Sequence, residues 1–210
     1  RRPTGAKIGI IGATPSVDRV FEHLHKLDGP IVFDFTISGP SGEDVLGQQG
    51  LEAVVEHLSE PDLVTLRLND ASLVAGMEIP SLDDAQVAAQ RIAQQGAERV
   101  LLRCGKLPTH FFDEEASPPD YALDLFYDGE DFALFEAPYL DALDNHHGAS
   151  SGLLLPLLKH LQSGLDFELA LQKAKGRVSN ALRAAQQQHT ENRVPTFFDT
   201  LENEPTIEEA

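Results

Sequence analysis

A run of small and polar residues, Gly148-Ala149-Ser150-Ser151-Gly152, stands directly before the apolar stretch that begins at Leu153. The apolar stretch predicts a helix. The first turn of a helix carries free backbone N–H groups and the positive end of the helix dipole. Small residues let an anion such as phosphate approach those groups closely. The run therefore predicts an anion-binding loop, although a plain helix cap formed by Ser150 or Ser151 is an equally good interpretation.

Two histidines, His146 and His147, precede this loop. Because histidine titrates near neutral pH, either ring is able to act as a base or to contact a phosphate. A pair of loop histidines is more often exposed to solvent or caps a helix, and that interpretation stays open.

Strands and helices that would position the loop alternate along residues 7–105. Short apolar runs predict buried strands at 7–11, 31–35, 63–66 and 100–102, and amphipathic segments between them predict helices. Gly76 is expected to end one of these helices, and Ser81 and Gly96 to cap and to end the next one. Continuous apolar strands separated by helices are typical of a mostly parallel sheet that is covered on both faces.

The pattern changes after residue 120. Asp128-Gly129 separates two apolar segments, 123–127 and 132–135, and such a dipeptide is a strong signal for an antiparallel hairpin. Two helices are expected at 153–161 and 167–185. Residues beyond 188 are expected to form a tail.

Polar residues that follow the predicted strands are the first candidates for a site, because open α/β sheets bind ligands at the carboxyl ends of their strands. They are Asp34, Asn69, residues 103–106 and the loop at Gly148. Cys104 lies among them, but it is expected to be a buried apolar residue, since no activating neighbour is visible.

The composition of the chain restricts its partners. The 210 residues carry a net charge of −18, which argues against binding to nucleic acid or to anionic membranes. A single cysteine excludes a disulfide framework and favours a cytoplasmic location, and no run is long enough to span a bilayer. The chain begins without methionine, so a preceding segment is expected to be absent.

One rival interpretation is a hydrolase. Gly148-Ala149-Ser150-Ser151-Gly152 matches the Gly-x-Ser-x-Gly nucleophile elbow, and His189 could serve a triad. The elbow must follow a buried strand, however, and residues 143–147 do not form one, so this interpretation is disfavoured.

Several segments together resemble one known family. They read Ala-Lys-Ile-Gly-Ile-Ile-Gly at 6–12, Pro-Ile-Val-Phe-Asp at 30–34, Val-Leu-Leu-Arg-Cys-Gly-Lys-Leu-Pro at 100–108, Asp-Leu-Phe-Tyr-Asp-Gly at 124–129, Asn-His-His-Gly-Ala-Ser-Ser at 145–151 and Ala-Leu-Gln-Lys-Ala-Lys at 170–175. In this order they are similar to the ribokinase-like small-molecule kinases, most of all the hydroxymethylpyrimidine/phosphomethylpyrimidine kinases of thiamine biosynthesis. The likeness covers nearly all of residues 6–185.

This resemblance implies a three-layer α/β/α sandwich with an antiparallel hairpin at the sheet edge, in one N-terminally incomplete domain over 1–188 with a tail over 189–210. It implies that ATP and Mg²⁺ are used to phosphorylate a small pyrimidine, and it leaves a homodimer open. The implied site comprises catalytic Gly148, Ser150, Ser151 and His147, nucleotide-binding Arg103, Gly105, Ala149 and Lys175, and magnesium-binding Asn69, Asp70 and Asp34.

Several positions depart from the family pattern. Ser150 replaces the second glycine of the family's Gly-Thr-Gly-Cys loop, and Ser151 replaces its final residue, which serves as the base. A serine hydroxyl is a poor general base near neutral pH. The family's Asn-x-x-Glu reads Asn69-Asp70-Ala71-Ser72, and its Lys-Gly-Gly reads Arg103-Cys104-Gly105. The front of the family's domain has no counterpart. A non-catalytic relative that binds a ligand or a partner is therefore the alternative.

Overall fold

The computed structural model describes residues 4–12, 14–24, 26–37, 45–107, 121–139 and 149–188. The strands are β1 (Ala6–Ile8), β2 (Ile31–Phe35), β3 (Leu63–Arg67), β4 (Val100–Gly105), β5 (Tyr121–Tyr127) and β6 (Phe132–Pro138). The helices are α1 (Thr14–Leu24), α2 (Gly47–Val55), α3 (Leu68–Ala75), α4 (Leu82–Gln94), α5 (Ala149–Gln162) and α6 (Phe167–Gln188).

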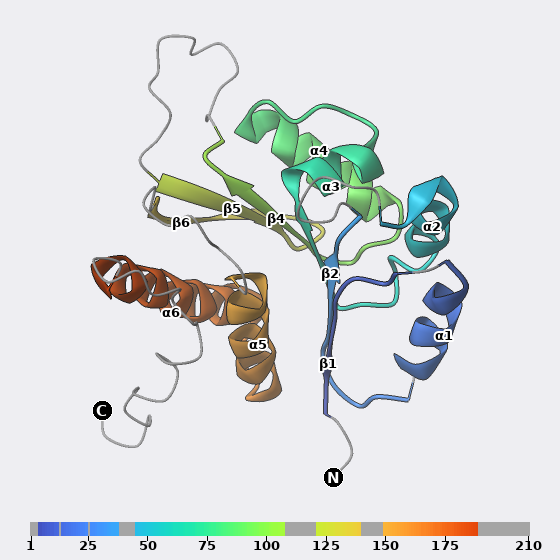
Figure 1. Cartoon of the computed structure of the whole chain (residues 1–210), viewed down its shortest axis with the longest axis horizontal. Coiled ribbons are helices and arrows are strands. Elements are labelled where there is room, and N and C mark those ends of the chain that lie inside the picture. Colours follow the sequence, from blue (N-terminus) through green and yellow to red (C-terminus); the bar gives the residue numbers. More distant parts are fainter. Residues whose placement is uncertain are drawn as a thin grey trace.

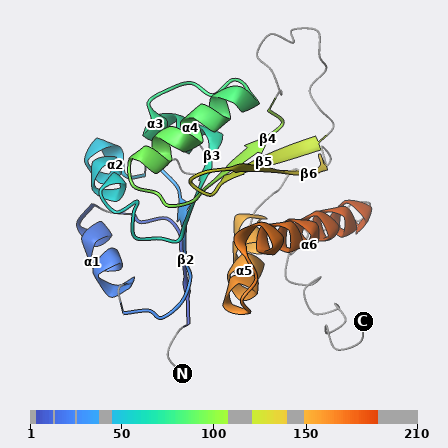
Figure 2. The same cartoon turned by 180° about the vertical axis from the view of Figure 1, so that it is seen from behind.

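The strands form one sheet in the order of the sequence, from β1 to β6. β1 to β4 are parallel to one another, and β5 and β6 continue the sheet as an antiparallel pair. Helices α1 to α4 cover one face, and α5 and α6 lie on the other (Figures 1 and 2). The predicted three-layer α/β/α sandwich with an antiparallel edge is confirmed.

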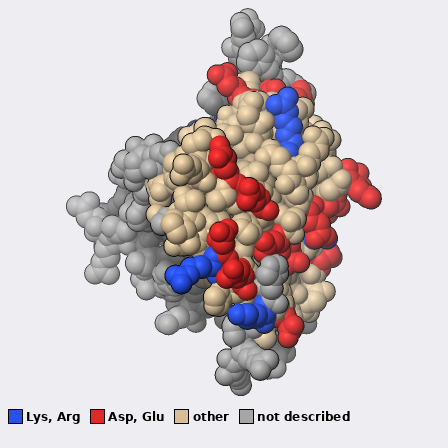
Figure 3. Space-filling model, turned by 90° about the vertical axis from the view of Figure 1, so that its right-hand side faces the viewer, with Lys and Arg blue, Asp and Glu red and all other residues tan. Residues whose placement is uncertain are grey.

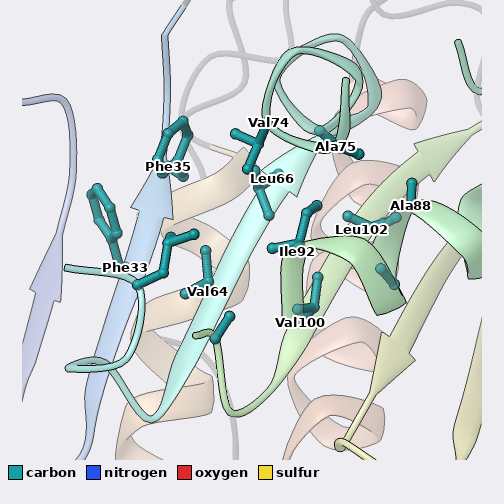
Figure 4. Close-up of a cluster of buried hydrophobic side chains, with 14 of the residues drawn as sticks. Phe33, Phe35, Val64, Leu66, Val74, Ala75, Ala88, Ile92, Val100 and Leu102 are labelled. Carbon is teal, nitrogen blue, oxygen red and sulfur yellow. The ribbon is translucent and has the colours of Figure 1, made fainter. Parts of the chain in front are cut away.

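The larger core fills the space between the sheet and the helices α1 to α4. Phe33, Val64, Val100 and Leu102 point from neighbouring strands toward α3 and α4, where Ile92 meets them (Figure 4). Because side chains alternate along a strand, every second residue of β2, β3 and β4 belongs to this core.

The second core lies between the sheet and the pair α5–α6. The intervening strand residues Val32, Leu63, Leu101 and Phe126 face it. Leu154 and Leu157 of α5 are fully buried against them, together with Ala170, Leu171 and Ala174 of α6. This packing fixes α5 over the sheet, so the first turn of α5 has a defined place relative to the strand ends.

Several boundaries follow local chemistry as expected. Ser81 Oγ accepts a hydrogen bond from the backbone N–H of Asp84 and so caps α4. Gly76 ends α3 with a left-handed backbone, φ +63°. The hairpin is also confirmed, although its loop spans four residues, because the Asp128 carboxylate accepts from the N–H groups of Glu130 and Asp131.

Other boundaries differ from expectation. β1 ends at Ile8 rather than at residue 11, and Ile10 is 56% exposed beyond it. α1 ends at Leu24 and α2 at Val55, so Leu27 and Leu58 pack against the core from the turns that follow these helices. The apolar pattern of the sequence therefore continues beyond the residues at which these helices end.

The face of the molecule that carries α1 and α2 shows more acidic than basic surface (Figure 3). No helix in the described ranges combines the length and the apolar character that crossing a membrane requires. The expected tail over 189–210 lies outside the described residues.

Candidate functional site

Polar side chains occupy the α5–α6 face of the sheet above the second core. Along each strand they alternate with residues of the larger core. They therefore point to the opposite face of the sheet, on the same side as Val32 and Leu101. All lie toward the carboxyl ends of β1 to β4, where β5 begins. This set, here called the polar layer, consists of one residue from each of the first five strands: Lys7, Asp34, Thr65, Arg103 and Asp124.

Asp34 is the centre of the polar layer, and its exposed fraction is 6%. Arg103 Nη2 donates to Asp34 Oδ1 at 2.8 Å, and Lys7 Nζ lies 3.1 Å from Oδ2. The hydroxyl of Ser150, in the first turn of α5, donates to the same Oδ2 at 2.5 Å. Three elements, β1, β4 and α5, are therefore joined through one buried carboxylate.

A second ion pair lies beside this centre. Lys175 of α6 contacts Asp124 of β5, with 2.5 Å between Nζ and Oδ2, and both side chains are largely buried. With Lys7, Arg103 and Lys175 opposite two carboxylates, the ionised cluster has a net charge of +1. The floor of the site is therefore positive in a chain whose net charge is −18.

Two buried polar atoms of the layer lack a hydrogen-bond partner among the described residues. They are Oγ1 of Thr65, whose side chain is fully buried, and Nε of Arg103. Such groups cost stability, and native proteins keep them mainly at strained or functional places.

A cavity of about 370 Å³ opens over the polar layer. Its volume lies in the range of small-molecule sites. Arg103, Asp124, Ser150 and Lys175 form its polar side. Its remaining walls come from β4, β5, β6 and the two helices: Gly105, Ala122, Ala137, Pro138, Tyr139, Ala149, Leu153, Val178, Ser179 and Leu182.

The rim of this cavity is shaped by the end of β4. The pairing of β4 with β5 shifts register between Arg103 and Gly105, which places Cys104 as an extra residue in a bulge. Gly105 has φ +60°, a conformation that glycine adopts without strain. Lys106 then reaches over the ring of Tyr139, 4.0 Å from its centroid, and joins the ends of β4 and β6.

Cys104 is buried, as expected from the sequence. Burial, together with the neighbouring Asp124 carboxylate, raises the pKa of its thiol to about 12. A thiol with that pKa is protonated at neutral pH, so this residue does not supply a nucleophile.

The residues predicted to hold magnesium are not brought together. Asn69 is exposed at the start of α3. Asp70 is fully buried, and its carboxylate accepts from the N–H of Ile37 and from Arg67 Nε, at 3.2 and 3.1 Å. Within the part of the chain that the structure describes, no three His, Cys, Asp or Glu residues are grouped to hold a metal ion. A magnesium ion bound mainly through nucleotide phosphates and water does not require such a group.

The loop predicted to bind the anion is described only in part. Ala149 and Ser150 open α5 and line the cavity, and Ser151 is half-buried beside them. Gly148, His147 and His146 lie outside the described residues, as does His189 of the rival hydrolase triad.

Comparison with known proteins shows the family to which the chain belongs. The family model described as phosphomethylpyrimidine kinase matches residues 2–196. The chain belongs to the phosphomethylpyrimidine kinase family. A hydroxymethylpyrimidine/phosphomethylpyrimidine kinase of Aquifex aeolicus is 31% identical over 85% of this chain, and one of Rhizobium meliloti is 28% identical over 85%.

Solved structures agree with the fold. The pyridoxal kinase of Staphylococcus aureus in complex with ADP is 26% identical, with a TM-score of 0.73 over 86% of this chain. The chain spans about two thirds of the length of its relatives: 67% of the Aquifex kinase, 64% of the Rhizobium kinase and 63% of the Staphylococcus kinase.

Sequence reasoning missed part of the site in this family member. Lys7 and Asp124 were not predicted as site residues, although both are charged residues inside apolar strand runs, which is the signal that could have found them. The cavity walls at Tyr139, Val178 and Leu182 carried no such signal, since apolar residues there are indistinguishable from core residues.

Proposed function

We propose that this chain is part of an ATP-dependent kinase that phosphorylates hydroxymethylpyrimidine or its phosphate. The observation that carries the proposal is the cavity, which joins an apolar compartment to Arg103, Lys175 and the first turn of α5. A cavity of this volume with apolar walls is suited to binding a nucleotide base and sugar. Its positively charged floor is suited to binding the phosphates.

The chain's own groups would act on the transferring phosphoryl group through charge and position. Phosphoryl transfer depends mainly on positioning and on stabilising the charge of the phosphoryl oxygens. The N–H groups at the start of α5 and the Arg103 guanidinium would supply that stabilisation. Magnesium would neutralise the triphosphate, held mainly through the nucleotide phosphates and water.

Ser151 would face the attacking oxygen at the position that the family fills with its base. A serine there supplies a hydrogen bond rather than a strong proton acceptor. The kinase would therefore depend on phosphate stabilisation more than on base catalysis.

The pyridoxal kinase neighbour favours a second substrate, a pyridoxal-like hydroxymethyl pyridine. Both substrates present a hydroxymethyl group on a flat heteroaromatic ring, so the same phosphate site would serve either.

Substrate-dependent ADP release, measured with the complete gene product and Mg²⁺, tests the proposal. Hydroxymethylpyrimidine, its monophosphate and pyridoxal are supplied in turn, and one pyrimidine is expected to give turnover. Arg103→Ala should lower kcat/KM about 100-fold, as for loss of a charged transition-state donor. The matched control Arg19→Ala, on the exposed side of α1, should keep wild-type turnover.

No ADP release with any of the three compounds, from protein shown to be folded, would contradict the proposal. It would favour the non-catalytic relative, for which the serine at position 151 is the supporting observation.

A further inference from the structure

The Asp34 carboxylate has a feature that its predicted role as a metal ligand does not explain. It is 6% exposed, and it is absent from the residues that line the cavity. Arg103 and Ser150, which donate to its two oxygens, do line that cavity. Asp34 therefore lies behind the two groups that a ligand would meet.

Asp34 joins the end of β4 to the first turn of α5, two places that belong to different layers of the fold. Arg103 stands at the end of β4, whereas Ser150 stands on a helix that packs over the sheet through apolar contacts at Leu153, Leu154 and Leu157. Apolar contacts are not directional, whereas a charge-assisted hydrogen bond between carboxylate and hydroxyl adds a directional constraint on the first turn.

Lys7 reduces the free-energy cost of burying the Asp34 carboxylate. Its ammonium group, 3.1 Å from Oδ2, and the Arg103 guanidinium together offset the burial of the carboxylate charge. Asp34 can then hold Ser150 while the surrounding cluster keeps its net positive charge.

We propose that Asp34 is a positioning residue that holds the Arg103 guanidinium and the first turn of α5 at a fixed separation, with Ser150 as its link to the helix, so that both face one phosphoryl group. The inference rests on the proposed kinase function and deepens it. The link belongs to this chain, because Ser150 stands where the resembled motif has a glycine that offers no hydroxyl.

A double-mutant cycle tests the link, with Asp34→Asn, Ser150→Ala and both changes together. Asp28→Asn and Ser59→Ala, at exposed positions, are the matched controls. The first readout is amide hydrogen exchange at residues 153 and 154, whose N–H groups close the first turn of α5. Each single change should speed this exchange about tenfold, the double change should speed it no further, and the controls should leave it unchanged.

The second readout is steady-state kinetics of the complete gene product. Each single change should lower kcat about tenfold and change KM for ATP less than about threefold, because the aligned pair acts on the transferring group. The double variant should resemble the slower single variant. A general loss of structure would instead raise KM, and loss of a metal ligand would raise the Mg²⁺ requirement in Asp34→Asn alone.

Unchanged exchange in Ser150→Ala, or effects of the two changes that multiply, would overturn the inference. If Asp34→Asn does not fold, amide hydrogen exchange of Ser150→Ala alone still tests the inference, since this change removes only a hydroxyl. Absence of turnover in the wild type would refute the proposed kinase function, and the exchange cycle would still decide whether Asp34 positions α5.

Discussion

The buried hydroxyl of Thr65 shows how one residue of the polar layer weakens the fold. Its Oγ1 is fully buried beside Asp34 in the sheet and has no hydrogen-bond partner among the described residues. We expect Thr65→Val, which keeps the shape and removes the hydroxyl, to raise the free energy of unfolding by about 1 kcal/mol. Urea denaturation measures the change, and a loss of stability would mean that the hydroxyl is satisfied.

Arg103 offers a second test at the scale of the residue. Its Nε is buried without a partner in the described part of the chain, while Nη2 binds Asp34. Lysine at this position would keep the charge near Asp34 without the orphaned Nε, and it is the residue of the resembled Lys-Gly-Gly motif. Arg103→Lys should therefore keep ADP affinity within about threefold, whereas Arg103→Met should lose about tenfold. Calorimetric titration of the two variants, which are nearly equal in volume, separates charge from packing.

Part of the site could be predicted from residue types at strand ends, and another part, such as Lys175 of α6, only from the resemblance to the family. Asp34, Arg103 and Ser150 belong to the first part, and the structure brings them together. Their mutual contacts could not be predicted, because Asp34 and Arg103 meet through the pairing of β2, β3 and β4, and Ser150 joins them through the packing of α5 against the sheet. Asp70 shows the opposite outcome, since a carboxylate selected for magnesium is engaged by Ile37 and Arg67.

At the scale of the element, His57 joins α1 to the end of α2. Its ring stacks on Phe21, donates from Nε2 to Asp18 at 3.0 Å and contacts Glu60 through Nδ1 at 2.5 Å. Burial lowers the pKa of His57, but the hydrogen bonds and charges of the two carboxylates outweigh it, so the pKa lies above its ordinary value of 6.5.

This raised pKa predicts a pH-dependent contribution to stability. The stabilisation is fully present below pH 6.5, the ordinary and unfolded value, and is lost as the pH rises through the higher folded pKa. His57→Gln should therefore lower the melting temperature more at pH 6 than at pH 9. Thermal unfolding of both proteins at the two pH values measures this, and an equal loss at both would show that His57 acts through packing alone.

The ends of helices and strands were predicted well where a capping or turn residue marked them. They were predicted less well where only the apolar periodicity of the sequence indicated them. Ser81, Gly76 and Asp128-Gly129 each marked a boundary through a specific hydrogen bond or backbone angle. Leu27 and Leu58 continue the apolar pattern beyond α1 and α2, because turns that follow a helix also contribute residues to the core.

At the scale of the whole molecule, the face that carries α1 and α2 shows more acidic than basic surface (Figure 3), whereas the charged cluster at the cavity floor has a net charge of +1 in a chain whose net charge is −18. The fold class followed from alternating apolar strands and helices, which is a property of the entire chain rather than of any one motif. The chain spans about two thirds of its relatives' length.

The most direct test of this account is titration of ADP into the wild type and into Ala122→Trp, whose new side chain would fill the cavity. The chain contains no tryptophan, so the introduced ring also reports binding by its fluorescence. The wild type should bind ADP with a Kd of about 1 μM to 1 mM, the range typical of enzyme substrates, and the variant at least about tenfold more weakly, with an unchanged melting temperature. Wild-type protein that is folded but binds no ADP, or a variant that binds it equally well, would contradict the account.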